Sequence, residues 1–153
     1  MSQNSVSSSL IDQISQQELH HLITVSTGFI DAYIVECHNK SPMLIPQNIV
    51  LSALDSPTKV KSVDWHDLSL PVYSVCHPDK TLGVALVIEG DDIDQRFALM
   101  CNEMPETIRL RISEIVDDER ENTDATIFQY VKMGDKDYHI PHIANIQLSL
   151  GIK

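Results

Sequence analysis

The sequence lacks several features that mark common classes of protein. It has no run of about 20 apolar residues that would span a membrane, and its start does not show the basic and then apolar order of a secretion signal. Its three cysteines, Cys37, Cys76 and Cys101, show no C-x-x-C spacing. An odd, sparse set of this kind is typical of buried free thiols in a reducing cytoplasm. We therefore expect a cytoplasmic protein that is not integral to a membrane.

Basic residues are also scarce. The chain has 11 Lys and Arg against 22 Asp and Glu, which gives a formal net charge of −11. A field of this sign repels phosphate backbones, and no local basic cluster offsets it, so we expect no nucleic-acid partner. A net charge of this sign would attract a partner protein with a basic surface. The length of 153 residues fits a single compact domain with a real core.

Motifs for known chemistry are missing as well. Five glycines in all leave no glycine-rich phosphate loop before a helix, and no Ser lies in a Gly-x-Ser-x-Gly turn. One alternative is a small metal-dependent or hydrolytic enzyme that uses His66, Asp67, His139 and His142. A structural zinc site needs two short-spaced pairs of ligands that face one point. Here a proline lies between His139 and His142, and the adjacent pairs Cys37-His38 and Cys76-His77 would point to opposite faces of a strand. We therefore expect no catalysis, no metal and no other cofactor.

Short apolar segments separated by turn residues are what the sequence does contain. Residues 1–28, rich in Ser and Gln, predict a flexible or weakly helical segment. About ten strand candidates follow, and they lie near residues 29–37, 43–45, 47–54, 60–65, 68–75, 82–88, 96–101, 107–112, 125–131 and 138–140. We expect a break at 55–58, an acidic loop at 117–122 and a short amphipathic helix from Ile143 to Leu150. Many strands and little helix favour small β-barrels over an alternating βα enzyme.

An internal echo connects two hairpin-like segments. Tyr33 to Pro46 and Phe128 to Pro141 match at a constant offset, each as an aromatic-rich strand, a turn, a short strand and Ile-Pro. Two related halves would produce this echo. So would the general similarity of β-hairpins, and the sequence leaves both explanations open.

The stretch from Val60 to Val75 holds the only tryptophan and predicts a strand, a tight turn and a second strand. Its segment Trp65-His66-Asp67-Leu68-Ser69-Leu70-Pro71-Val72 resembles a motif of the CheW-like domain, the coupling module of bacterial chemotaxis arrays. That motif reads aromatic or Leu, Arg, Gly, two variable residues, a hydrophobic residue, Pro and Val. Two further matches follow the same order, Leu44-Ile45-Pro46 with Val50, and Ala98 to Asn102. The resemblance runs from about residue 29 to residue 150.

The resemblance implies a mainly β fold of two five-stranded SH3-like β-barrel subdomains. We expect a single domain at 29–152, with sub-barrels at roughly 29–81 and 82–152. The family's function implies a non-enzymatic adaptor in chemosensory signal transduction. It would couple a methyl-accepting chemoreceptor to the regulatory domain of a CheA-like histidine kinase at membrane-associated receptor arrays.

The chain departs from the family motif at the turn, where His66-Asp67 replaces Arg-Gly. In this it resembles the divergent ChpC and PilI kind, which serves type IV pilus systems and twitching motility. Contacts of this sort need apolar anchors with a polar rim. The candidate protein-binding residues are the anchors Ile49, Val50, Trp65 and Leu68 and the rim residues His66 and Asp67. For Trp65 the alternative is a core residue that plugs the end of a barrel.

Overall fold

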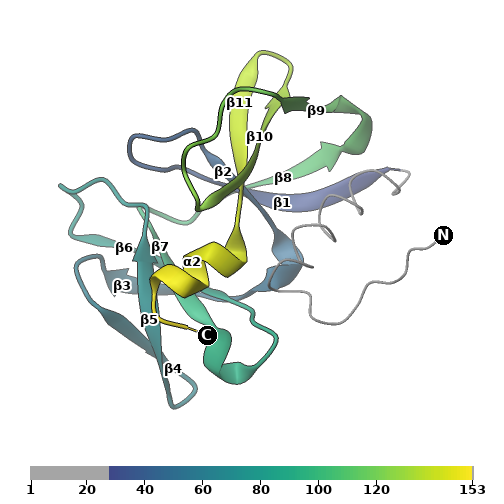
Figure 1. The fold of residues 1–153 in the computed structure, drawn as a ribbon. Coiled ribbons are helices and arrows are strands. Elements are labelled where there is room, and N and C mark those ends of the chain that lie inside the picture. The colour runs from purple at the N-terminus through teal and green to yellow at the C-terminus, as the bar shows by residue number, and fades with distance from the viewer. Residues whose placement is uncertain (1–27, 153) are drawn as a thin grey trace.

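The structure is a computed structural model that describes residues 28–152, so the predicted N-terminal segment 1–28 lies outside the described residues apart from Gly28. The strands are β1 Phe29–Val35, β2 Met43–Pro46, β3 Val50–Pro57, β4 Ser62–Trp65, β5 Leu68–Ser74, β6 Leu82–Ile88, β7 Phe97–Cys101, β8 Glu106–Arg111, β9 Ile115–Asp118, β10 Ile127–Met133 and β11 Lys136–Pro141. Short 3₁₀ turns cover η1 Gln47–Ile49, η2 Ile93–Gln95 and η3 Ile112–Glu114, and helix α2 covers Ile143–Ser149. The mainly β character and the short C-terminal helix are confirmed (Figure 1).

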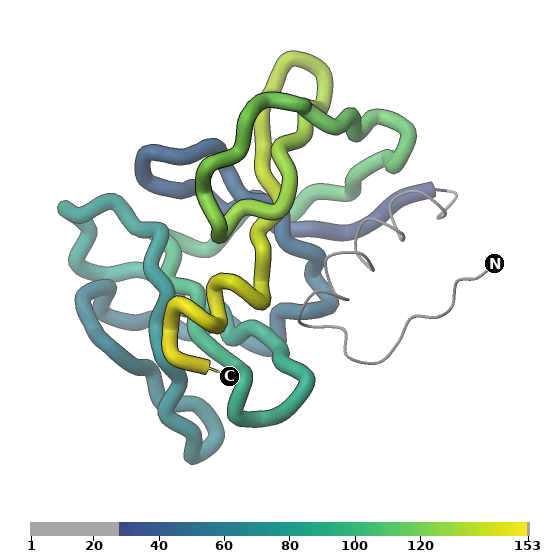
Figure 2. Tube along the Cα trace, viewed as in Figure 1, coloured from purple at the N-terminus to yellow at the C-terminus, as the bar shows by residue number. Residues whose placement is uncertain are grey.

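The strands of the described chain form two sheets. The first has the order β8-β1-β2-β11-β10-β9 and the second the order β3-β6-β7-β5-β4. They hold six and five strands, where the family resemblance implied five and five. The chain passes from the first sheet to the second between β2 and β3 and returns between β7 and β8, as the trace in Figure 2 shows. A boundary near residue 81 would fall between β5 and β6, which belong to the same sheet, so the expected halves do not coincide with the sheets.

A core shared by both sheets holds the fold together. Strand β6 lies inside the second sheet and is apolar on both faces, as its unbroken apolar run predicts. Its residues Val84, Leu86 and Ile88 pack with Val35, Met43 and Ile45 of the first sheet and with Ile143 and Ile146 of α2. Ala85 and Val87 point to the other face and join a separate cluster with Leu70, Ala98 and Met100. Helix α2 therefore closes the space between the two sheets (Figure 1).

Two local predictions were wrong. Strand β3 continues through the expected break, because Asp55 and Pro57 pair with Val84 and Leu82 of β6. A proline is tolerated there since β3 is an edge strand with no neighbour on its other side. The expected acidic loop contains the end of β9, where Asp118 pairs with Tyr130 of β10. Arg120 compensates the negative charge of Asp118, because its Nη2 lies 2.6 Å from Oδ2 of Asp118.

The two echoing segments lie side by side in the first sheet. They form the hairpins β1–β2 and β10–β11, which meet where Met43 of β2 pairs with His139 of β11 in parallel. Each hairpin ends in Ile-Pro and leads into a helical turn, η1 after the first and α2 after the second. The echo therefore joins two neighbouring hairpins of one sheet and does not relate one sheet to the other.

Candidate protein-binding surface

The β4–β5 hairpin carries the tryptophan motif, and its geometry follows the predicted strand, turn and strand. Trp65 and Leu68 pair directly across the hairpin, which leaves His66 and Asp67 as a two-residue turn. Both turn residues are left-handed, with φ of 51° at His66 and 64° at Asp67. This is the pattern of a type I′ turn, whose twist matches that of the flanking strands. Both side chains of the turn are exposed.

Trp65 is partly buried and has contacts of two kinds. With Leu68 it packs against the apolar cluster that contains Leu70 and Met100. Trp65 also contacts two polar side chains. The ring centroids of Trp65 and His66 are 4.2 Å apart, and the guanidinium carbon of Arg96 lies 5.5 Å from the tryptophan ring centroid. Trp65 thus covers one end of a core cluster and also presents part of its ring, edged by basic groups, to the outside.

Arg96 forms an ion pair with Glu89, and the pair joins the two ends of the β6–β7 connection. Its Nε lies 3.4 Å from Oε1 of Glu89, and both atoms are buried without a hydrogen bond inside the described part of the chain. The backbone N–H of Glu89 donates to the carbonyl oxygen of Ile49 at 2.9 Å. The sequence analysis missed Arg96 and Glu89. The signal available was the opposite charge at the two ends of the 90–95 connection.

Ile49 and Val50 do not join Trp65 and Leu68 in one cluster. They pack against the core shared by the two sheets, whereas Trp65 and Leu68 pack on the opposite face of the second sheet. Glu89 and Arg96 lie between the two groups, because Glu89 contacts Ile49 and Arg96 contacts Trp65. We use the name hairpin surface for Trp65, His66, Asp67, Leu68 and Arg96.

The four residues of the enzyme alternative lie in separate places. His66 and Asp67 are in the exposed turn of the second sheet, while His139 is 1% exposed inside β11 of the first sheet. Nδ1 of His139 lies 3.0 Å from the Ser41 hydroxyl, and burial, with the charge of Lys40, lowers the pKa of His139 to about 4. Nδ1 of His142 accepts from the Asn145 N–H at 3.1 Å and caps α2. Between residues 28 and 152, no three His, Cys, Asp or Glu side chains gather in a way that could hold a metal.

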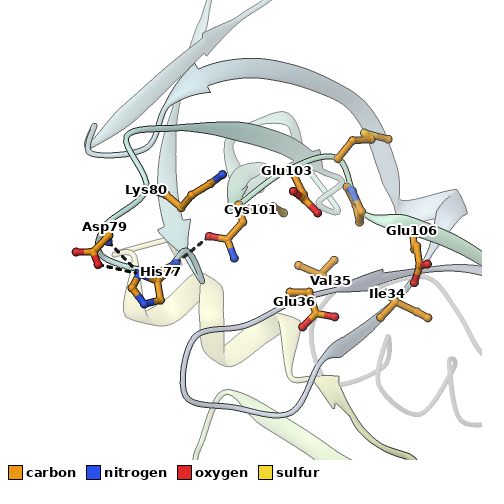
Figure 3. Close-up of a pocket in the computed structure, with 12 residues that line it drawn as sticks. Ile34, Val35, Glu36, His77, Asp79, Lys80, Cys101, Glu103 and Glu106 are labelled. Carbon is orange, nitrogen blue, oxygen red and sulfur yellow. Dashed lines mark hydrogen bonds and ion pairs between the residues drawn. The ribbon is translucent and has the colours of Figure 1, made fainter.

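A cavity of about 550 Å³ opens where the end of β1 meets the β5–β6 and β7–β8 connections (Figure 3). Its lining consists of Ile34, Val35, Glu36, His77, Asp79, Lys80, Cys101, Asn102, Glu103, Met104, Pro105 and Glu106. One wall is fixed by hydrogen bonds, since Asn102 Oδ1 accepts from the His77 N–H at 2.9 Å and His77 Nδ1 accepts from the Asp79 N–H at 3.1 Å. Sequence reasoning missed this cavity because its residues come from three distant segments. The spacing of Glu103 and Glu106 around Pro105 was the only local signal.

Comparison with known proteins identifies the fold. No protein-family model matches the sequence, and no curated protein matches it. Among solved structures, the chain is similar to the scaffolding protein TtCheW from Thermoanaerobacter tengcongensis, with a TM-score of 0.54 and 14% sequence identity over 74% of this chain and 88% of that chain. The chain therefore has a CheW-like fold. No helix in the described part is long and apolar enough to cross a membrane.

Proposed function

We propose that this chain is a non-enzymatic adaptor of bacterial chemosensory signal transduction, which couples a methyl-accepting chemoreceptor to the regulatory domain of a CheA-like histidine kinase. The observation that carries the proposal is the likeness in fold to a protein described as a CheW scaffolding protein, over 88% of that chain. The order of the sequence motifs around Pro46, Pro71 and Cys101 supports it independently. The adaptor acts in the cytoplasm, at membrane-associated receptor arrays.

The hairpin surface has the composition that a protein contact requires. The ring of Trp65 and the side chain of Leu68 supply a rigid apolar centre, and both are partly exposed. His66, Asp67 and Arg96 surround this centre with polar groups of both signs. Ile49 and Val50 form a second apolar group, which packs on the opposite face of the second sheet. We assign the kinase regulatory domain to the hairpin surface and the receptor to the region of Ile49 and Val50.

A finer assignment concerns the system in which the adaptor works. Where the resemblance expects Arg-Gly, the exposed turn holds His66-Asp67, which makes the turn more negative by about two charges at neutral pH. Electrostatic complementarity across an interface suppresses partners with the wrong charge. We therefore propose a partner different from that of ordinary coupling proteins, in a type IV pilus system that controls twitching motility and uses adaptors of the ChpC or PilI kind.

A binding experiment with matched variants tests the proposal. The full chain is titrated with the kinase regulatory domain and, separately, with the receptor tip, and binding is measured by calorimetry. Asp67→Asn keeps a residue type that accepts a positive φ and removes the charge from the turn. Asp135→Asn removes an exposed charge from the β10–β11 turn and serves as the control. The proposal expects Asp67→Asn to change the affinity for the kinase domain and the control to leave it unchanged. Absence of binding to both kinase and receptor would contradict the coupling role.

A further inference from the structure

The cavity described above belongs to a longer groove. A second recess of about 500 Å³ shares Ile34, Glu36 and Glu106 with it and continues to Pro42, Lys136, Asp137 and Tyr138. Ile34 pairs with Glu106 across β1 and β8, and Glu36 follows two residues after Ile34, so the three side chains lie on one face. The groove thus runs from the 77–80 loop past Glu36 and Glu106 to the β10–β11 hairpin. Two adjoining recesses of this size suit an extended segment better than a single small ion.

The groove is lined by the carboxylates of Glu36, Asp79, Glu103, Glu106 and Asp137 and by two lysines, Lys80 and Lys136. At its far end, Asp137 pairs with Arg120 and Lys132. Glu36, Glu103 and Glu106 form no ion pair with another residue between 28 and 152. In Figure 3 the carboxylates of Glu103 and Glu36 lie on opposite sides of the opening. With Asp79 and Lys80 included, the first cavity has a formal charge of −3 while His77 is neutral.

The groove also has an apolar part that a simple inorganic cation would not use. Ile34 and Pro105, both partly exposed, line it, and Met104 is 50% exposed at its edge. An occupant that satisfies both features carries positive side chains for the carboxylates and apolar side chains between them. We propose that this groove binds an extended basic segment of a partner protein, in which Lys or Arg alternates with apolar residues.

Two occupants from the protein itself fit less well. The 27 residues that precede the described chain contain no Lys or Arg, so they cannot supply the cations. A second copy has a net charge of −11 as well, and the two copies repel each other. The inference goes beyond the proposed adaptor function, because the groove contains no residue of the hairpin surface and stands whether or not that surface binds a kinase.

The test uses the full chain labelled with ¹⁵N and three probes. The first is a six-residue peptide that alternates leucine or valine with lysine or arginine. The second is the same peptide with glutamine at every basic position, and the third is spermidine. The basic peptide is expected to shift the amide signals of Ile34 to Glu36, of Asn102 to Met104 and of Glu106. The neutral peptide is expected to leave them in place.

Variants of equal charge change separate a specific site from general attraction to an acidic protein. Glu36→Gln with Glu106→Gln should weaken the basic peptide by roughly fivefold or more, as expected for two partly exposed ion pairs. Glu119→Gln with Glu121→Gln, in the exposed acidic connection, should weaken it by less than about twofold. Equal weakening in both double variants would overturn the proposal. So would shifts confined to other residues, or spermidine binding at the same amides as tightly as the peptide. Loss of kinase binding in the hairpin variants leaves these results unaffected, so the two proposals fail separately.

Discussion

Replacing Asp67 by glycine should stabilise the protein, because the backbone at this position is left-handed. A left-handed conformation costs an ordinary L-residue roughly 1–2 kcal/mol, and Asp lies at the low end of that range or below it. Asp67 has φ of 64°, and its exposed side chain makes no hydrogen bond or ion pair with the rest of residues 28–152. Glycine removes the steric cost without the loss of a contact. Its greater freedom in the unfolded chain offsets about 0.5–1 kcal/mol of this gain.

The expected net gain is at most about 0.5 kcal/mol in the free energy of unfolding. Urea denaturation followed by fluorescence measures it, since Trp65 is the only tryptophan of the chain and lies next to the turn. Asp64→Gly is the matched control, because Asp64 is an exposed residue of β4 whose φ is not positive. This control should lose about 0.5–1 kcal/mol. A loss of stability in Asp67→Gly as large as that in Asp64→Gly would refute the reasoning from backbone conformation.

The same geometry bears on the family motif. The resemblance expects Arg-Gly at this turn, and a glycine suits φ of 64° at the second position. If glycine is the more stable residue there, Asp67 carries a stability cost that its own fold does not explain. We infer that the carboxylate of Asp67 serves a contact outside the chain. The double variant His66→Arg with Asp67→Gly should therefore be more stable and should bind the natural partner less tightly.

Three further results are expected. Trp65→Ala should lower the free energy of unfolding by about 2–4 kcal/mol, somewhat less than for a fully buried tryptophan, as measured by circular dichroism in urea. Burial raises the pKa of Cys37 to about 12, so this thiol should react slowly with a disulfide reagent at pH 8 in the native protein and rapidly after unfolding. The pKa of His139 is lowered to about 4 in the native protein, so as the pH falls this histidine is protonated in the unfolded chain before it is protonated in the native one. Through this residue, the free energy of unfolding should decrease by roughly 3 kcal/mol in total between about pH 6.5 and pH 4. In the His139→Gln variant, this part of the pH dependence of the unfolding free energy should be absent.

For each of these three expectations, one outcome would contradict it. An unfolding free energy that Trp65→Ala leaves within about 0.5 kcal/mol would show that the ring is not part of the core. A native Cys37 that reacts as fast as an unfolded one would contradict its burial. A wild-type protein and a His139→Gln variant with the same pH dependence would show that His139 is not held neutral by the fold.

The sequence predicted those parts of the fold that depend on local patterns. The alternation of Ile108 and Leu110 with outward arginines defined β8, and the unbroken apolar run of β6 marked a strand inside its sheet. The composition of the two sheets was not predictable in this way. Strand β2 pairs with β11 and strand β1 with β8, and these choices depend on contacts between distant segments. The extension of β3 to Pro57 and the presence of β9 depended on edge positions that only the assembled sheets define.

The candidate site shows the same division. Trp65, His66, Asp67 and Leu68 are contiguous, so a sequence motif is enough to place them together on a hairpin. Arg96 reaches Trp65 only because β6 and β7 fold back beside the hairpin. The groove at Glu36 and Glu106 depends on the pairing of β1 with β8, two strands that are distant in the chain. Sites assembled from distant segments in this way leave no spacing in the sequence for a motif to capture.

Binding of the full chain to the kinase regulatory domain is the decisive measurement for the proposed coupling role. The ¹⁵N-labelled protein is titrated with the unlabelled domain, and the shifted amide signals are assigned. The account predicts saturable binding, with the largest shifts at Trp65 to Leu68 and at Arg96, and with weaker binding by the His66→Arg and Asp67→Gly double variant. Absence of binding, or shifts that leave the β4–β5 hairpin unaffected, would contradict it.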